Sequence, residues 1–366
     1  MQKQKLVPEI RFKGFEEEWN QKVINQTLIP VISTLTMSNV QGKGEILLFD
    51  ANSIVGYSSY ALSSVPYLTI IKDGAGVGRI RKLPGNSAFL GTMTGLIPRN
   101  VDIDFIHSLI STLSLEKSFS GSTIPHIYFS DYGKLKIYIP YFSEQQKIGQ
   151  FFSSIDSLIQ SQELKLKKLN EIKQSLLSKM FASKNQKFPE IRFKGFEEEW
   201  KTAILDDFID YERPDKYIEK LPLLEFGRIP VLTANKSFKL GYTESKNYYA
   251  KGDCILFDDF TLDSKYVNFP FMVVSSALKI LTLKNNQDSL PYYFAILSNN
   301  TFESQGHARH YISVVAKTSI KISDNITEKN LIGSFYNYID SLISSQELKL
   351  EKLNNIKQAL LEKMFC

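Results

Sequence analysis

Few residues of this chain have the types and spacing that catalysis or cofactor binding requires. The turn GAGVG at 74–78 contains part of a nucleotide-binding pattern, but Arg79 occupies the position where G-x-G-x-x-G needs its last glycine. His307 and His310 lie three residues apart, and the other two histidines offer no obvious third metal ligand. The sequence also lacks a G-x-x-x-x-G-K-S/T phosphate loop, an H-E-x-x-H motif and a methyl-donor loop. We therefore expect no catalytic activity, no cofactor and no metal site in this chain.

Basic and aromatic residues instead gather beside turns. Arg79, Arg81 and Lys82 follow the glycine-rich turn, and Lys43 lies in the turn QGKG. Arg can bind a guanine edge through two hydrogen bonds, and Lys or Tyr can bind phosphates, so such turns suit DNA recognition. Any one of these residues alone would more often be solvated surface, and only the set favours DNA. The residues predicted to contact DNA are Lys43, Arg79, Arg81, Lys82, Lys236, Tyr242, His307, Arg309 and His310.

The elements that must position these residues are organised by two internal repeats. The segment PEIRFKGFEEEW at 8–19, called box A below, recurs unchanged at 189–200. The segment 155–181 recurs at 339–365 with 22 of 27 positions identical. The regions between these repeats show no comparable similarity to each other. Two copies of one framework therefore hold two different insertions.

The second repeat predicts a long helix in each half. Its mostly apolar seam follows the steps of four and three that are typical of a coiled coil. Ser143 and Gln146 fit a capping box, and the helix should extend over about 38 residues, roughly 57 Å. The positions that differ between the copies lie on the face opposite the seam, so we expect the two helices to pack antiparallel within one chain. The alternative is that each helix lies on its own globular domain. The seam of the first copy is Ile148, Phe152, Ile155, Ile159, Gln162, Leu166 and Leu169.

The two insertions are predicted to be mixed α/β domains. Apolar runs bounded by Gly, Asn, Asp and Pro predict strands, and two longer stretches fit helices. The predicted strands are 45–49, 67–71, 135–139, 254–257 and 277–283, and the predicted helices are 102–115 and 289–300. The expected segments are a first domain at 1–143, a central helix at 144–187, a second domain at 188–327 and a C-terminal helix at 328–366. The fold class is α+β, two mixed α/β domains joined by two long helices in an antiparallel coiled coil, with an internal pseudo-two-fold repeat.

Composition and charge set limits on the class of protein. The net charge of +5 weakly favours a polyanionic partner, and the excess of basic residues lies in the first half of the chain. Residues 20–143 carry ten Lys and Arg against seven Asp and Glu, whereas residues 201–327 carry fifteen of each. No run approaches the roughly 18 apolar residues of a membrane span, and the first residues lack the apolar run of a secretory signal. We expect a cytoplasmic protein that does not bind membranes. Its two cysteines suggest no disulfide framework.

The duplicated plan resembles the specificity subunit of type I restriction-modification systems. Pro140 followed by SEQQKIGQFFSSIDSLI is similar to that family's proline, Glu-Gln and Ile pattern before its conserved helix. GSTIPHI at 121–127 is similar to the segment that precedes this pattern. The second half departs from the family, because Glu328 is followed by Lys329 rather than Gln and the proline is absent. The resemblance covers nearly the whole chain.

The resemblance implies a non-catalytic DNA reader with two target recognition domains. Each domain would contact one half of a bipartite, asymmetric target in double-stranded DNA, and the helices would set the spacer between the halves. Two methyltransferase subunits, which methylate adenine at N6 with S-adenosylmethionine, would bind this chain, and ATP-driven motor-nuclease subunits would join through the assembly. The cofactors would then belong to the partners. The alternative is a two-domain protein-protein adaptor on a coiled-coil spacer, which the balanced charge of 201–327 permits.

Two leucines are candidates for docking the methyltransferase subunits. Leu164 and Leu348 are leucine in both copies, although they lie on the helix face whose residues otherwise differ. A single exposed leucine is ordinary on any protein surface, but its duplication favours contact with two identical partners. Gln160, Lys167 and Glu171 would form a tolerant polar rim around this contact.

Overall fold

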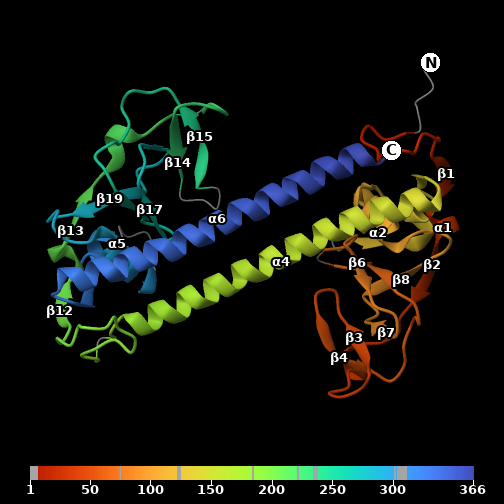
Figure 1. Ribbon diagram of the computed structural model, residues 1–366, viewed down its shortest axis with the longest axis horizontal. Helices are drawn as coiled ribbons and strands as arrows, with labels where there is room; N and C mark the ends of the chain where they lie inside the picture. The colour runs from red at the N-terminus through yellow and green to blue at the C-terminus, as the bar shows by residue number, and fades with distance from the viewer. Residues whose placement is uncertain are drawn as a thin grey trace. The chain divides into compact units, whose positions relative to one another are not determined.

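The chain folds into two compact units. The computed structural model describes residues 7–74, 76–121, 125–183, 185–220, 222–233, 238–300, 302 and 311–366. The first unit comprises Met1–Glu163 and Leu348–Cys366, and the second comprises Leu164–Glu347. Each unit therefore contains one of the dissimilar regions together with part of both long helices (Figure 1).

The first unit is built on two small sheets. Its antiparallel four-stranded sheet has the order β2 (Leu28–Ile32), β8 (Met93–Pro98), β5 (Tyr67–Ile71) and β6 (Ile80–Leu83). Its three-stranded sheet has the order β4 (Ile54–Ser58), β3 (Ile46–Phe49) and β7 (Ser87–Phe89), with β3 and β7 parallel. Two further strand pairs are β1 (Asn20–Val23) with β11 (Lys136–Ile139) and β9 (Phe119–Ser120) with β10 (His126–Ile127). The helices are α1 (Ile24–Thr27), α2 (Ile103–Ser111) and α3 (Phe129–Tyr132).

The second unit is built in the same way. Its antiparallel four-stranded sheet has the order β13 (Ile209–Glu212), β19 (Leu278–Leu283), β16 (Cys254–Asp258) and β17 (Ser264–Val267). Its three-stranded sheet has the order β15 (Lys239–Thr243), β14 (Ile229–Leu232) and β18 (Met272–Val273), with β14 and β18 parallel. The remaining elements are the pair β12 (Lys201–Ile204) with β20 (Ser319–Ile322) and the helix α5 (Leu290–Asn299).

The two dissimilar regions therefore share one topology. The strand orders of the two four-stranded sheets correspond one to one, and each three-stranded sheet combines one antiparallel with one parallel pair. In both units a strand pair, β1–β11 or β12–β20, leads directly from the end of box A to the start of a long helix. Because strand pairing depends on which positions are apolar rather than on which apolar residue fills them, the surfaces can diverge while the topology remains.

The two long helices match the predicted length. They are α4 (Phe142–Met180) and α6 (Ile326–Met364), each of 39 residues. In the first unit Asp156 of α4 pairs with Lys357 of α6 at 2.5 Å, and the ring of Phe152 lies 5.7 Å from that of Phe365. From Phe152 to Asp156 the residue number rises along α4, whereas the number of the contacting residue falls from Phe365 to Lys357. The two helix segments in this unit therefore run antiparallel. Figure 1 shows the end of α6 beside the start of α4 here.

The second unit pairs the other halves of the two helices. Lys173 of α4 forms an ion pair with Asp340 of α6, and its ammonium group lies 4.7 Å from the centre of the Tyr336 ring. This pair is the repeat image of Asp156 and Lys357, because both residues are displaced by 184 positions. The predicted antiparallel packing of the two helices is confirmed within each unit.

The predicted capping box of α4 is wrong. The helix begins at Phe142, one residue before the proposed cap, so that Ser143 lies in its first turn. Gln145 rather than Gln146 holds this end of the helix, because its amide accepts a hydrogen bond from Asp102 N at 3.0 Å and donates one to Pro140 O at 2.8 Å. In α6 the side chain of Asn325 accepts hydrogen bonds from the first-turn N–H groups of Thr327 and Glu328.

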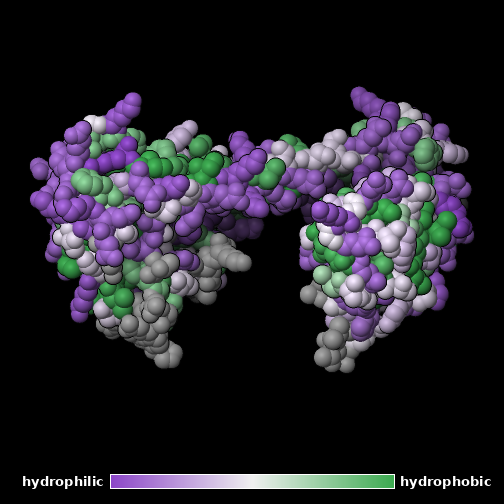
Figure 2. Space-filling model, turned by 90° about the horizontal axis from the view of Figure 1, so that it is seen from below, coloured by the Kyte–Doolittle hydropathy of each residue, from purple (hydrophilic) through white to green (hydrophobic). Residues whose placement is uncertain are grey.

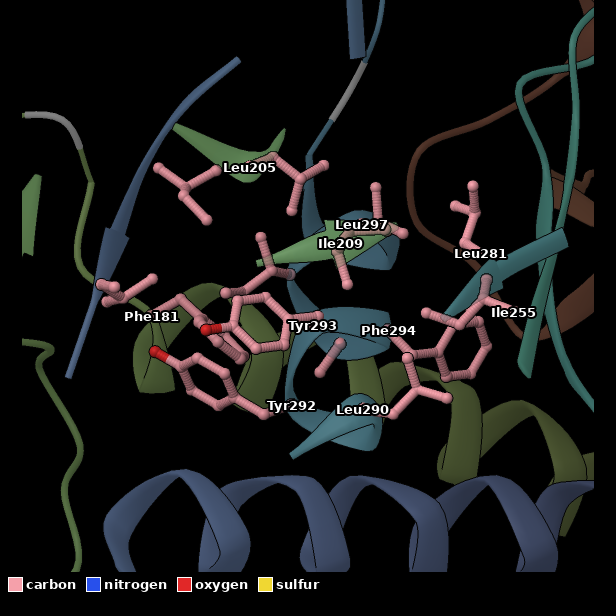
Figure 3. Close-up of a cluster of buried hydrophobic side chains, with 14 of the residues drawn as sticks. Phe181, Leu205, Ile209, Ile255, Leu281, Leu290, Tyr292, Tyr293, Phe294 and Leu297 are labelled. Atoms are coloured by element: carbon pink, nitrogen blue, oxygen red, sulfur yellow. The ribbon is translucent and has the colours of Figure 1, made fainter. Parts of the chain in front are cut away.

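Aromatic clusters join each helix pair to its sheet. In the first unit Trp19 of box A packs against Phe105 of α2 and against Phe365, the residue that follows α6, at 5.8 and 6.1 Å between ring centres. In the second unit Trp200 of box A packs against Phe181 and Tyr292, at 5.9 and 6.1 Å. Figure 3 shows this second core, with Tyr292 and Tyr293 of α5 directed toward Phe181. Such clusters contribute much of the apolar burial of a small domain.

Box A connects the start of one helix to the end of the other. In the first unit Arg11 binds the buried carboxylate of Glu144 through two hydrogen bonds of 2.7 and 2.8 Å, and Ile10 N donates to Lys363 O. In the second unit Arg192 binds Glu328 through bonds of 2.6 and 2.9 Å, and Ile191 N donates to Lys179 O. The invariance of this twelve-residue segment thus reflects one joint that is built twice.

Most predicted elements of the two insertions are present. The structure confirms the strands predicted at 45–49, 67–71, 135–139, 254–257 and 277–283 to within one residue at each end. Helix α2 ends at Ser111, four residues before its predicted end, because the chain enters a 3-10 turn at Leu115–Ser118. None of the helices in the described ranges is long and apolar enough to cross a membrane. Cys254 is buried, and this burial raises the pKa of its thiol to about 12, whereas Cys366 is exposed.

Candidate nucleic-acid interface

The basic cluster after the glycine-rich turn is divided between two faces of the sheet. Arg79 precedes β6, and Arg81 and Lys82 lie within it. Successive side chains of a strand point to opposite faces, so Arg79 and Arg81 face the β3–β4 connection whereas Lys82 faces α2. The structure therefore brings Arg79 and Arg81 together and separates Lys82 from them.

The two arginines line the loop between β3 and β4. Arg79 donates from Nη2 to Ala51 O at 2.5 Å and to Asn52 Oδ1 at 2.7 Å. The Arg81 guanidinium lies 5.2 Å from the centre of the Phe49 ring, and its Nη1 has no hydrogen-bond partner among the described residues. Partial burial opposes ionisation of Asp50, but N–H groups of Ser53 and Asn52 and the charge of Arg81 together lower its pKa. This loop is therefore held firmly by polar contacts.

Lys82 belongs to a polar cleft beside the helix pair. It forms an ion pair with Asp104, next to a cavity of about 470 Å³ between β6, α2 and α4. His107 lines the same cavity, and its pKa is lowered mainly by burial, against a smaller opposing effect of Asp156. Burial of His107 therefore favours its neutral form, and the two lysines that line the cavity, Lys82 and Lys357, are paired with Asp104 and Asp156.

The glycines of the turn at 74–78 adopt a backbone conformation that favours glycine. Gly74, Gly76 and Gly78 all have φ near +80°, a conformation that residues with a side chain rarely adopt. Beside them the carboxylate of Asp73 binds His126 Nδ1 at 2.6 Å. Lys43 lies in the exposed turn before β3, where Gly44 allows close approach to Tyr57.

In the second unit only part of the predicted DNA-contact set can be placed. Lys239 donates to Tyr242 Oη at 2.7 Å, and its ammonium group also lies 4.7 Å from the centre of the Tyr242 ring. The predicted contacts Lys236, His307, Arg309 and His310 lie outside the described residues. Tyr242 is thus the one predicted contact of this unit that falls within the described part of the chain.

The predicted docking residues on the helices are exposed. The side chains of Leu164 and Leu348 are 53% and 50% exposed, and Gln160 and the pair Lys167 with Glu171 are exposed as well. On the face drawn in Figure 2 the helices are mainly hydrophilic, with isolated hydrophobic side chains. The structure adds two duplicated apolar positions that sequence reasoning missed, namely Leu158 with Leu342 and Ile172 with Ile356. Each unit therefore presents one exposed apolar side chain from each of these three duplicated pairs on its helix segments.

Sequence reasoning also missed features that depend on tertiary structure. The sequence did not predict the ion pair between Arg11 of box A and Glu144, because the two residues are 133 positions apart. The turn between β16 and β17 was overlooked because its central side chain, Phe260, has no charge. Its flanking aspartates, in the sequence DDFTLD, were the available signal for an ordered turn.

Part of the chain matches a known protein family. Residues 10–174 match the family described as Type I restriction modification DNA specificity domain. A stretch of 135 residues is 38% identical to the Type I restriction enzyme EcoR124I/EcoR124II specificity subunit of Escherichia coli, over 35% of this chain and 33% of that protein. The Type I restriction enzyme MjaVIII specificity subunit of Methanocaldococcus jannaschii is 22% identical over 332 residues, 80% of this chain and 77% of that protein.

A solved structure shares the fold. The S subunit of a Type-I restriction-modification system from M. genitalium superposes with a TM-score of 0.78 at 16% identity, over 98% of this chain and 99% of that one. Among the two relatives matched by sequence, the match with this chain spans about a third of the E. coli subunit and most of the M. jannaschii subunit. The chain is therefore similar to type I restriction-modification specificity subunits, and the family model matches residues 10–174 of it.

Proposed function

We propose that this chain is the non-catalytic DNA-recognition subunit of a type I restriction-modification complex. One observation carries the proposal: two units whose four-stranded and three-stranded sheets have the same strand order present different residues at equivalent places on a duplicated framework. A framework of this kind would suit a target with two unlike halves, one read by each unit. In this proposal the predicted recognition domains are residues 1–143 and 188–327, and the helices set the spacer between the halves.

The proposal assigns the chemistry to partner subunits. Two methyltransferase subunits would dock on the helices and modify adenine, and motor-nuclease subunits would join through the assembled complex. The net charge of +5 is small for a protein that must hold duplex DNA alone, because each neutralised phosphate requires a cation. We therefore expect the isolated chain to bind DNA weakly in the cytoplasm and the assembled complex to bind it tightly.

Domain exchange tests the modular reading of the target. Replacing residues 201–327 with the corresponding region of a relative should change one half of the methylated motif and leave the other half intact. The physical reason is that the first unit, including box A at 8–19 and its joint with Glu144, is untouched by the exchange. The measurement is a sequencing map of methylated adenines in cells that express each chain. A simultaneous change of both halves would contradict the proposal.

The basic residues of the first unit make separate predictions. If Arg79 or Arg81 binds a base edge, its replacement by Ala should reduce the free energy of DNA binding by about 1 to 3 kcal/mol. It should also reduce the preference for one base at a single position of the target. If Lys82 binds a phosphate, Lys82→Ala should weaken binding to all DNA sequences alike. It should also reduce by about one the slope of the logarithm of the binding constant against the logarithm of the salt concentration.

The measurement is binding of the assembled complex to single-base variants of its target at two salt concentrations. Lys134→Ala removes an exposed cation outside the predicted cluster and serves as the control. If the Arg79, Arg81 and Lys82 variants all bind DNA with the affinity and salt dependence of the wild type, these residues do not contact DNA.

A further inference from the structure

The turn between β16 and β17 holds an exposed aromatic ring in a rigid frame. Asp258 Oδ1 accepts hydrogen bonds from the N–H groups of Phe260 and Thr261 at 2.8 and 2.7 Å, and Leu262 N donates to Asp258 O at 3.0 Å. Leu262 has a φ of +61°, which is rare and strained for a leucine. Its side chain packs against the core of the unit, whereas Phe260 is 67% exposed. The turn therefore directs one apolar residue inward and holds the other outside.

Buried charges anchor the base of this turn. The carboxylate of Asp259 is buried and lies 3.1 Å from Lys279 Nζ, and Asp259 Oδ1 accepts a hydrogen bond from Tyr311 N at 3.0 Å. The Tyr311 ring in turn stacks on Tyr211 at 5.6 Å and lies 5.6 Å from the Phe257 ring. A buried ion pair is costly to disturb once formed. Phe260 is thus presented by a turn that hydrogen bonds and a buried ion pair hold in place.

The equivalent turn of the first unit has different chemistry. The β5–β6 turn occupies the same place in the topology, between the strands that correspond to β16 and β17. It also uses an aspartate, Asp73, to bind the segment that follows the helix, here through His126. In place of an exposed phenyl ring it offers glycines and Arg79. The two units share an anchoring device and differ in what the turn presents, as expected for readers of two different half-sites.

We propose that Phe260 is a specificity-determining residue that contacts the C5-methyl group of a thymine in the major groove. This inference rests on the proposed DNA-recognition function. A phenyl ring offers no hydrogen bond to a base edge, and the faces of paired bases are covered by their neighbours in the stack. The apolar group that the major groove presents is the thymine methyl, and Phe is among the side chains suited to it. A rigid turn favours this contact because no ordering of the loop opposes binding.

The test removes the methyl group from DNA and the ring from the protein. The assembled complex is titrated with duplexes of its mapped target in which each thymine of the second half-site is replaced in turn by deoxyuridine. We expect one replacement to weaken binding of the wild-type complex by roughly four-fold, the effect of losing one buried methyl group. Phe260→Ala should bind the thymine and deoxyuridine duplexes equally, with an unchanged melting temperature because the ring is exposed.

A matched variant separates this contact from a general loss of apolar surface. Phe269 is 41% exposed and lies just beyond the other end of β17. Phe269→Ala should keep the full difference between thymine and deoxyuridine. Retention of that difference in Phe260→Ala, or its absence from the wild type at every thymine, would overturn the inference. A wild-type complex without preference for its mapped target over a scrambled duplex would instead overturn the DNA-recognition function itself.

Discussion

Replacing Arg11 of box A with methionine should destabilise the first unit by about 3 to 5 kcal/mol. The carboxylate of Glu144 is only 1% exposed, and Arg11 binds both of its oxygens. This hydrogen bonding also raises the pKa of Arg11 above its ordinary value. Without Arg11 a buried charge would be left without its counterion. Urea unfolding, followed by tryptophan fluorescence, measures the loss.

The second unit contains the same joint with one more donor. Glu328 is 0% exposed and binds Arg192, but Trp200 Nε1 also donates to it at 3.3 Å. The equivalent Trp19 Nε1 has no hydrogen-bond partner among the described residues. We therefore expect Arg192→Met to cost less than Arg11→Met.

Two controls make this comparison decisive. Lys187→Met breaks the exposed ion pair with Glu199 and should change the free energy of unfolding by less than about 1 kcal/mol. Arg11→Met combined with Glu144→Met should recover most of the loss, since an apolar pair can replace a buried ion pair at little cost. A single Arg11→Met variant as stable as wild type would show that the joint does not hold the unit together.

Replacing both duplicated leucines with glutamate should abolish assembly with the methyltransferase subunits. The proposed contacts are Leu164 in the second unit and Leu348 in the first, each about half exposed. A charge placed in an apolar contact would have to lose its hydration on binding. Leu164→Glu alone should release one methyltransferase copy, and the double variant should release both, as counted by native mass spectrometry.

The repeat itself supplies a matched control for this experiment. Position 167 is Lys in the first copy, and its equivalent in the second copy is Glu351. Lys167→Glu adds a charge close to Leu164 but only installs the residue that the other copy already has, so assembly should be retained. Circular dichroism should show unchanged helix content in every variant, because these side chains are outside the cores. If the double variant still forms a complex with two methyltransferase subunits, neither leucine is a docking contact.

Local patterns predicted the elements but not their partners. The long helices were predictable because their apolar spacing persists over 39 residues, and the strands because short apolar runs end at turn residues. The shared topology of the two insertions could not be predicted, because it depends on pairs such as β2 with β8 and β13 with β19, whose residues lie more than 60 positions apart, and because it leaves no common sequence. The cap of α4 was misplaced because Gln145 finds its partners at Asp102 and Pro140, which no local pattern specifies.

The candidate interface was predictable only in outline. Charge and turn residues led to Arg79, Arg81 and Lys82, but the sequence did not show that Lys82 faces Asp104 while Arg79 binds the β3–β4 loop. The alternation of side chains along β6 decides this, and it requires the bounds of the strand. Phe260 had no sequence signal of its own, since its exposure follows from a turn that buries Leu262 and Asp259 instead.

The most direct test of DNA recognition by this chain is a genome-wide map of N6-methyladenine in cells with and without it. We predict a bipartite, asymmetric motif that is methylated when the chain is present, lost when it is deleted and restored when it is supplied again. Persistence of every methylated motif after deletion would contradict the account.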